Sequence, residues 1–436
     1  MVSKTKGFRQ GAVPGEEYVE AGRDMAESEI AAKFLQDAGY DMLNCDNGTY
    51  DAWYWAHPPV YMPENCNLDD VAHIKKFVDV PVVCAGRMTV EKGAEAVANG
   101  DLDGVGFARN FLADPAWFTK VIEDREEDIR PCILCHNGCF NMCHYKGVPN
   151  DQALSDSLHL ARCAVNAEMM QWDKHHITKT SKPRTVHIVG GGIGGMEAAR
   201  VLKLRGHNPI IYEKSDRLGG TFIAASAESY KQRLRDLLAW YIREVGKLGI
   251  DVRLGTEVKD VAQFGDDPVI IATGAKPRRL PIPGYDKMVE ACDYLLGKEV
   301  GDKVAIIGGG LTGCEIAYEL EIQGRHPIIV EMKDDLVSQK GVCLANSSYL
   351  REYFAYKQVP VYLETKLKEV KDGAVVVTRK DGSEETIECD SVIGSLGYVS
   401  DPLVPKGKNI QLVGDCLSVG NLRSVIWRAY EVAMKI

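Results

Sequence analysis

Thr185-Val-His-Ile-Val-Gly190-Gly-Gly192-Ile-Gly-Gly195 is the stretch that decides the fold of this 436-residue chain. An apolar strand runs into a cluster of glycines, a helical pattern follows, and a second strand over 209–212 ends at Glu213. Glycines at this spacing let the backbone approach a pyrophosphate at a helix N-terminus, and the carboxylate can accept a hydrogen bond from a ribose hydroxyl. The stretch therefore predicts a dinucleotide-binding α/β fold, whose candidate cofactor-binding residues are Gly190, Gly192, Gly195 and Glu213.

The same pattern returns further along the chain as Lys303-Val-Ala-Ile-Ile-Gly308-Gly-Gly310-Leu-Thr-Gly313, followed by a strand that ends at Glu331. Gly190 and Gly308 are 118 positions apart, and the two glutamates keep the same interval. Because chance explains two matches in register poorly, we expect two dinucleotide sites and electron passage from one dinucleotide to another. The alternative is a pair of structural α/β folds with empty crevices. The candidate residues of the second site are Gly308, Gly310, Gly313 and Glu331.

Shorter fingerprints surround the first glycine stretch. Arg217-Leu-Gly219-Gly220 extends the match toward the FAD-type version of the fold. Two apolar strands, ending in Ala272-Thr-Gly274 and in Gly414-Asp415, resemble the strands that close the FAD site in two-dinucleotide reductases, where the position of Asp415 contacts the flavin. Pro281-Ile-Pro283-Gly284 resembles the crossover into an inserted NAD domain. We therefore expect an FAD domain at 183–284 and 386–436 around an NAD domain at 285–385, with Arg217, Gly220, Ala272, Gly274 and Asp415 as further candidates for FAD binding.

A group of cysteines precedes these folds. Cys132-Ile-Leu-Cys135-His-Asn-Gly-Cys139 places three thiols in eight residues, and Cys163 follows 24 positions later. Thiolates suit iron–sulfur clusters and zinc, and three close cysteines with a distant fourth favour a 4Fe-4S cluster. Zinc, or thiols that bind no metal or form disulfides, are the alternatives, and Cys143 could replace Cys139 or Cys163. We expect an iron–sulfur segment at 126–182 that ends in a polar, solvated linker.

Residues 1–125 alternate helix and strand at a spacing that predicts a parallel sheet. We expect helices at 16–38, 68–78, 89–99 and 113–123, with strands at 40–45, 81–85 and 103–107. A closed (β/α)₈ barrel needs eight strands, so these three would form part of a TIM barrel. The predicted fold class is therefore α/β, with a partial (β/α)₈ barrel followed by a cysteine segment and two Rossmann-like domains.

The ends of the second and third predicted strands carry arginines beside small residues. These are the pair Gly86–Arg87 and the pair Ala108–Arg109. In barrels, the loops after the last two strands commonly build a phosphate site from backbone N–H groups, and arginine holds phosphate in a bidentate fork. The plainer alternative is that both arginines are surface residues on the loops.

The loop over 47–61 is dense in aromatic residues and contains His57. On the active-site rim of a barrel, an aromatic wall suits a flat apolar substrate, and His57 could hydrogen-bond a carboxylate or carbonyl. The alternative is that the aromatics close the top of the barrel and His57 packs among them.

The composition excludes several classes of function. Apolar residues make up 45% and charged residues 26%, as in ordinary globular proteins, and the net charge of −10 with a pI of 5.6 argues against nucleic-acid and anionic-membrane partners. No apolar run approaches a membrane span, and the N-terminus has no apolar signal region, so we expect a cytoplasmic protein. In that reducing compartment the thirteen cysteines would be free thiols or metal ligands.

Taken together, these features resemble one flavoenzyme family that includes the old yellow enzymes, 2,4-dienoyl-CoA reductases, trimethylamine dehydrogenase and the clostridial 2-enoate reductases of anaerobes. Cys135-His-Asn-Gly-Cys139-Phe-Asn-Met-Cys143 and Trp53-Tyr-Trp-Ala-His57-Pro-Pro are most similar to the 2-enoate reductases. The resemblance implies FMN on the barrel, with its phosphate at Arg87 and Arg109, a 4Fe-4S cluster on the cysteines, FAD and NAD on the two glycine folds, and a catalytic His57. It also implies that the sequence begins near the fifth barrel strand, without the strand that carries the family's catalytic tyrosine.

The implied activity is NADH-dependent reduction of the activated C=C bond of a 2-enoate substrate, with electrons passing from NADH through FAD and the cluster to FMN. The implied full-length enzyme is a homo-oligomer. Two alternatives are an NADH-oxidising electron-transfer module, or diaphorase, that feeds a partner, and a non-catalytic fragment. Because Glu331 ends the strand where NADP-preferring sites usually supply arginine, the sequence also predicts a preference for NADH over NADPH.

Overall fold

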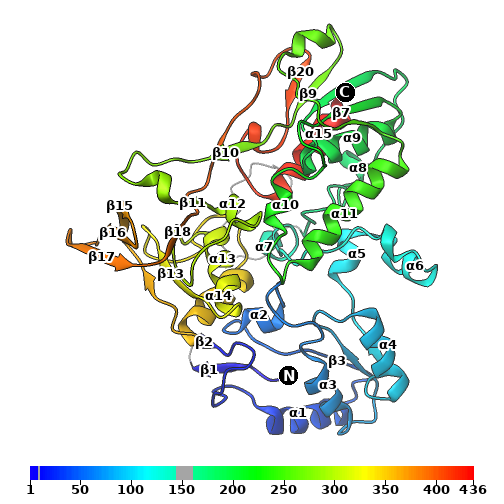
Figure 1. The fold of residues 1–436 in the computed structure, drawn as a ribbon. Helices are drawn as coiled ribbons and strands as arrows, with labels where there is room; N and C mark the ends of the chain where they lie inside the picture. Colours follow the sequence, from blue (N-terminus) through cyan, green and yellow to red (C-terminus); the bar gives the residue numbers. More distant parts are fainter. Residues whose placement is uncertain (8–9, 144–160) are drawn as a thin grey trace.

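The computed structural model describes residues 1–7, 10–143 and 161–436. Three parts surround the cysteine segment: the partial barrel at the bottom of Figure 1, the first dinucleotide fold at the top and the second at the left, with helix α7 between them. This arrangement supports the predicted fold class of a partial barrel followed by two Rossmann-like folds. Across the described ranges, no helix combines the length and the apolar character that crossing a membrane requires.

The partial barrel is a three-stranded parallel sheet in the order β3-β4-β5, with helices between the strands. Its core consists of apolar residues, including Cys45, Cys84 and Met88, from the strands, the connections and the inner faces of α1, α3 and α4. Its elements are β1 (Thr5–Gly7), β2 (Gln10–Gly11), α1 (Met25–Asp37), β3 (Leu43–Cys45), α2 (Trp53–Ala56), α3 (Leu68–Lys75), β4 (Val82–Cys84), α4 (Val90–Asn99), β5 (Gly104–Val105), α5 (Arg109–Ala113), α6 (Trp117–Ile122) and η1 (Glu126–Asp128).

Two predicted helices of this part were wrong in extent. The helix expected from residue 16 begins only at Met25, because Asp24 caps it by accepting from the N–H of Glu27 and Gly22 lies just before that cap. The helix expected over 113–123 begins only at Trp117, as α6, because Ala113 ends the separate helix α5 and Pro115 cannot continue it.

The cysteine segment has little regular structure. Helices α7 (Phe140–Cys143) and α8 (Trp172–His175) are one turn each. The adjacent residues Ile133 and Leu134 are buried in different cores, one shared with the first dinucleotide fold and one with the second. The expectation of a solvated linker was wrong at His175, which is buried and lies 2.7 Å through Nδ1 from the carbonyl of Ala167.

The first dinucleotide fold is a five-stranded parallel sheet in the order β20-β9-β6-β7-β8. Helices α9, α11 and α15 pack together over it. Its elements are β6 (Thr185–Val189), α9 (Ile193–Arg205), β7 (Asn208–Tyr212), α10 (Phe222–Ala225), α11 (Gln232–Lys247), β8 (Asp251–Arg253), η2 (Val261–Phe264), β9 (Val269–Ile271), β20 (Ile410–Leu412), η4 (Gly414–Cys416) and α15 (Leu422–Lys435).

The second dinucleotide fold has the equivalent five-stranded parallel order, β11-β18-β12-β13-β14, and adds the antiparallel sheet β15-β16-β17 at the left edge of Figure 1. The chain enters it through β10 (Ala275–Pro277) and returns through β19 (Tyr398–Ser400), which pair with each other. Its elements are η3 (Tyr285–Lys287), β11 (Val289–Glu290), α12 (Ala291–Leu295), β12 (Lys303–Ile307), α13 (Leu311–Ile322), β13 (His326–Val330), α14 (Leu344–Tyr356), β14 (Val361–Tyr362), β15 (Lys366–Lys371), β16 (Ala374–Thr378), β17 (Glu384–Glu388) and β18 (Ser391–Gly394).

Candidate functional site

The first glycine stretch leaves an open space at the start of α9. A Cβ at Gly190 would overlap the carbonyl of Ala272, and one at Gly195 would overlap the carbonyl of Gly190, so the backbone accepts only glycine there. At Gly192 the nearest protein atom would be 4.0 Å away, and no side chain caps the helix that begins after it. Uncapped N–H groups beside an open glycine fit a pyrophosphate.

The buried carboxylate of Glu213 holds this loop in place. Its Oε2 accepts from the N–H of Gly191 at 2.7 Å, and its Oε1 accepts from the backbone and the hydroxyl of Ser215 at 2.8 Å each. Glu213, the residue that follows β7, therefore fixes the glycine loop before any ribose is bound. The sequence analysis predicted that Glu213 contacts the ribose, and it missed that Glu213 also holds the glycine loop.

The other residues predicted for FAD lie around the same space. A Cβ at Gly220 would be 3.4 Å from the Cα of Gly192, and the N–H of Ala272 donates to Val189 at the end of β6. Asp415 follows Gly414, which lies against Gly194 of α9, and burial raises the pKa of its carboxyl. Arg217 is exposed, and Gly274 forms a left-handed turn with φ of 78°.

The second glycine stretch repeats this geometry. A Cβ at Gly308 would overlap the carbonyl of Ser395, one at Gly313 would overlap the carbonyl of Gly308, and Gly310 has its nearest protein atom 3.6 Å away. Glu331 accepts from the N–H of Gly309 at 2.6 Å and from that of Lys333 at 2.8 Å. Both folds therefore present the same uncapped helix start to a dinucleotide.

The four predicted cluster ligands lie within electrostatic reach of one another. Burial and the neighbouring Cys132 thiol raise the pKa of Cys139 to about 11 and that of Cys163 to about 12, and burial also raises the pKa of Cys135. The two parts of the segment are joined where the N–H of Arg162 donates to Gly138 at 2.6 Å. A Cβ at Gly138 would lie 2.6 Å from the backbone of Ala164, so glycine is required for this approach.

The four predicted ligands are all thiols, which is the donor set that a 4Fe-4S cluster uses. Among the described residues, no three His, Cys, Asp or Glu side chains meet closely enough to hold a single metal ion. The other candidate, Cys143, ends α7, but its side chain lies outside the described part of the chain, as do residues 144–160.

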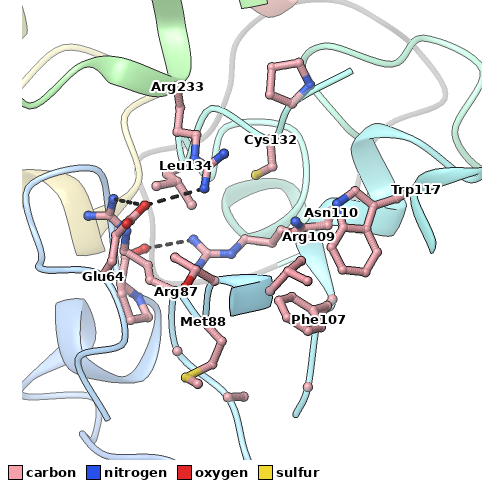
Figure 2. Close-up of a pocket in the computed structure, with 18 of the residues that line it drawn as sticks. Glu64, Arg87, Met88, Phe107, Arg109, Asn110, Trp117, Cys132, Leu134 and Arg233 are labelled. Atoms are coloured by element: carbon pink, nitrogen blue, oxygen red, sulfur yellow. Dashed lines mark hydrogen bonds and ion pairs between the residues drawn. The ribbon is translucent and has the colours of Figure 1, made fainter. Parts of the chain in front are cut away.

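A cavity of about 1030 Å³ joins the partial barrel to the cysteine segment. It lies beyond the carboxyl ends of β4 and β5, with α11 of the first dinucleotide fold as its opposite wall (Figure 2). Its volume is at the upper end for a small-molecule site. The predicted residues that line it are His57, Gly86, Arg87, Ala108, Arg109, Cys132 and Cys139. The tertiary structure thus brings the predicted flavin residues and two predicted cluster ligands to one space.

Arg87 uses part of its guanidinium to hold the aromatic loop. Its Nη1 donates to the carbonyl of Val60 at 2.9 Å and to that of Met62, and burial lowers its pKa to about 10. Its Nη2 lies 3.8 Å from Glu64, which also pairs at 3.5 Å with Arg233 of α11 (Figure 2). Arg233 is a cation at this cavity that sequence reasoning missed, because it lies 146 residues from Arg87 in another fold.

Arg109 extends into the cavity from the start of α5 (Figure 2). Its Nη1 donates to the carbonyl of Pro58 at 2.8 Å and to Nε2 of His136 at 2.6 Å. His57 lines the cavity, with its ring centroid 3.7 Å from that of Phe140 and 5.8 Å from that of Trp53. It therefore packs among aromatics and also faces the space, and its catalytic role stays a prediction.

Two further residues near the cysteines carried no sequence signal. His136 stands between two predicted ligands and is 2% exposed. Arg423, in the first turn of α15, is 1% exposed, lies over the ring of Trp427 at 5.3 Å and interacts electrostatically with Cys135. Only the tertiary structure shows that Arg423 lies near Cys135, because 288 residues separate the two in the sequence.

Comparisons with known proteins agree with this geometry. Residues 184–415 match the family described as pyridine nucleotide-disulphide oxidoreductase, and residues 13–128 match the NADH:flavin oxidoreductase / NADH oxidase family. Cinnamate reductase of Clostridium sporogenes is 38% identical over 99% of this chain and 64% of its own length. NADH oxidase of Thermoanaerobacter brockii is 30% identical over 97% of this chain and 65% of its own length.

Among solved structures, a 2-naphthoyl-CoA reductase complex superposes with a TM-score of 0.82 at 28% identity, covering 96% of this chain and 64% of that one. The chain thus spans slightly less than two thirds of the length of these relatives.

Proposed function

We propose that this chain, which belongs to the pyridine nucleotide-disulphide oxidoreductase family, reduces activated carbon–carbon double bonds with NADH as the reductant. The match of residues 13–128 to the NADH:flavin oxidoreductase family supports this proposal. The substrate class is a 2-enoate, an α,β-unsaturated acid or its derivative. A relative named cinnamate reductase at 38% identity supports this class, and so does the structural similarity to a protein named 2-naphthoyl-CoA reductase.

The comparisons support the predicted cofactor set of FMN, FAD, NAD and a 4Fe-4S cluster. When bound, these groups supply hydride and single-electron transfer, while the protein sets their positions. In our proposal, the uncapped start of α9 with Glu213 holds FAD, and the start of α13 with Glu331 holds NADH. Cys132, Cys135, Cys139 and Cys163 hold the cluster, and Arg87 and Arg109 face the flavin phosphate.

One observation carries this proposal: barrel residues and cluster cysteines line the same cavity. Arg109, His57, Cys132 and Cys139 all border the space of about 1030 Å³. A flavin held there by its phosphate would lie beside the cluster, and an enoate bound against the aromatic residues that line the cavity would lie beside the flavin. These aromatic residues are Phe107, Trp117 and Phe140. His57 lines the same cavity and can donate a hydrogen bond to the substrate carboxylate or carbonyl.

A second candidate is an NADH-oxidising electron-transfer module that feeds a partner. Two observations favour it: both dinucleotide folds have five-stranded sheets, whereas the described barrel sheet has three strands, and one relative is named NADH oxidase. The two candidates share every cofactor except FMN, so the flavin content distinguishes them.

Finer features of the proposal rest on composition and resemblance. The net charge of −10 favours neither nucleic acid nor an anionic membrane as a partner, and a cytoplasmic location suits the cysteines. We propose a homo-oligomer for the full-length enzyme.

The test is anaerobic NADH oxidation by the purified chain with a 2-enoate such as cinnamate and, separately, with ferricyanide. The proposal predicts enoate-dependent NADH oxidation with FMN and FAD both bound. Cys135→Ser should abolish the broad visible absorbance of the cluster and the enoate reaction while ferricyanide reduction through FAD persists. Activity with ferricyanide alone, with FAD as the sole flavin, would instead support the electron-transfer module. Equal iron in Cys135→Ser and the parent would contradict the cluster assignment.

A further inference from the structure

We infer that His136 is a positioning residue for the flavin-phosphate arginine: it fixes the Arg109 guanidinium in the cavity, and Asn346 of the second dinucleotide fold fixes His136 in turn. The inference rests on the proposed function, because it assigns the phosphate of FMN to Arg109. It adds a link between the nicotinamide-binding fold and the flavin cavity that passes beside the cluster ligands.

The first step concerns the hydrogen bonds of Arg109. A guanidinium carries five N–H donors, and two of them are on Nη1. Nη1 donates to the carbonyl of Pro58 at 2.8 Å and to Nε2 of His136 at 2.6 Å, which uses both. Within the described residues these are the hydrogen bonds of Arg109, so the edge formed by Nε and Nη2 stays available. That edge is the fork that grips a phosphate in two parallel bonds.

The second step concerns the state of His136. Arginine only donates, so Nε2 of His136 must accept and carries no proton. The proton then belongs to Nδ1, which lies 3.0 Å from Oδ1 of Asn346 and donates to it.

The third step concerns how firmly His136 is held. Its backbone φ is +53°, in the left-handed region that a non-glycine residue occupies only where the surrounding structure imposes it. The side chain is 2% exposed and Asn346 is 6% exposed. The neighbouring Asn137 donates from Nδ2 to the carbonyl of Gly341, so the connection before α14 and the first turn of α14 both dock on this segment.

The geometry has a specific consequence for flavin binding. Without the His136 acceptor, Nη1 of Arg109 keeps only its hydrogen bond to the carbonyl of Pro58. The guanidinium can then rotate about the Cδ–Nε bond, and its Nε and Nη2 donors no longer point in one direction. The loss should appear in the contribution of the phosphate to binding and leave the contribution of the isoalloxazine ring unchanged. The measured quantity is therefore the preference for FMN over riboflavin, which differ only in the phosphate.

The experiment equilibrates the purified chain with mixtures of FMN and riboflavin and quantifies the bound flavins after rapid gel filtration, with resident FAD as the internal standard. The parent should prefer FMN at least tenfold. His136→Leu should lower that preference at least tenfold, His136→Gln should retain most of it because the amide oxygen can accept from Arg109, and Asn346→Leu should lower it about three- to tenfold. Ser348→Ala, on the same helix but bonded to Leu344, is the matched control and should change nothing.

Two outcomes separate this inference from the proposal beneath it. If Arg109→Leu loses the FMN preference and His136→Leu keeps it, the phosphate site stands and the role of His136 is wrong. If the parent shows no preference for FMN, the phosphate assignment falls and this inference falls with it. Asn346→Leu changes none of the four predicted cluster ligands, and iron content measured beside each binding assay shows whether a loss of preference merely reflects a lost cluster. Unchanged preference in Asn346→Leu overturns the link to the second fold.

Discussion

The two dinucleotide folds of this chain share their design but use one position of it differently. Glu197 on α9 and Glu315 on α13 occupy equivalent places, two residues after Gly195 and Gly313 respectively, and both are buried. Glu197 pairs at 2.8 and 3.0 Å with Arg200 of its own helix. Glu315 instead accepts at 2.7 Å from Lys231 of the first fold and at 2.7 Å from Tyr61 of the barrel loop.

The buried glutamate of α9 is therefore paired within its own fold, whereas the buried glutamate of α13 is paired with residues of the first fold and of the barrel loop. Lys231 also contacts Glu228 at 3.1 Å, and Ser229 donates to Glu319 of α13 at 2.8 Å. Tyr61 stacks on Tyr349 of α14 with ring centroids 5.3 Å apart. The second fold is therefore fixed against both neighbours by buried polar and aromatic contacts, and its orientation toward the cavity is set by those contacts.

Of the changes considered, removing the Lys231 cation should have the largest effect on the packing of the second fold against the first. Lys231→Met leaves Glu228 and Glu315 buried without their cation, which should destabilise the docked arrangement by about 3–5 kcal/mol. The second fold should loosen, and proteolysis in the connections next to β10 and β19 should accelerate. Arg200→Met should destabilise the first fold by a similar amount without this accelerated cleavage. Equal cleavage of both variants would show that Glu315 has no special docking role.

Replacing each of the two glutamates that follow β7 and β13 with glutamine tests whether the folds bind different dinucleotides. A 2′-phosphate beside Glu331 brings like charges together, so the parent should prefer NADH over NADPH by about 2–4 kcal/mol, or roughly 30- to 1000-fold in kcat/KM. Glu331→Gln should reduce that preference at least tenfold and leave FAD content intact. Glu213→Gln should lower FAD content without altering the preference. Ferricyanide reduction measures the preference, and a parent that prefers NADPH would contradict the role of Glu331.

The docking interface should also make stability depend on pH. Burial raises the pKa of Glu228 to about 7, above its ordinary value of 4.5, although Lys231 opposes the shift. The folded protein then retains a proton that the unfolded chain has released, so the contribution of Glu228 to stability falls as pH rises from about 4.5 to about 7 and is level outside that window. The loss should be up to about 3 kcal/mol. Thermal unfolding between pH 4.5 and 8 measures it, and a Glu228→Gln variant with an equally steep profile would refute the assignment.

The smallest expected effect concerns the turn that follows each glutamate. Gly219 in the first fold and Val337 in the second both have positive φ, of 122° and 48°, and each donates its N–H to the second glycine of its stretch, at 2.9 and 2.8 Å. A Cβ at Gly219 would lie 2.8 Å from Ile223, whereas the Val337 side chain is buried in the core shared with the barrel loop.

Gly219→Ala should therefore cost about 1–2 kcal/mol through strain and lower FAD content. Val337→Ala should cost about 1 kcal/mol through lost burial and leave FAD content unchanged. Urea unfolding with flavin analysis measures both. Loss of FAD from the Val337 variant would mean that the two turns are not independent.

Much of the fold was predictable because its signals are local. Gly206 ends α9 in a left-handed turn, Thr89 caps α4, and the alternation of strand and helix fixes parallel sheets, each through contacts within a few residues. The helix predicted from residue 16 was wrong because its apolar pattern continued past the cap at Asp24. In the site, the glycines and the glutamates were identifiable because backbone sterics admit few alternatives at those positions.

The sequence by itself determined the two glycine stretches, their common register, the four candidate ligands and the arginines at the strand ends. Only the tertiary structure decided which of these groups meet. Arg109 reaches His136, His136 reaches Asn346 210 residues away, and Lys231 reaches Glu315 84 residues away. A local pattern fixes the conformation of a turn or a helix start. Contacts between folds depend on how whole sheets and helices pack, and the spacing of two residues in the sequence does not show whether they lie close together in space.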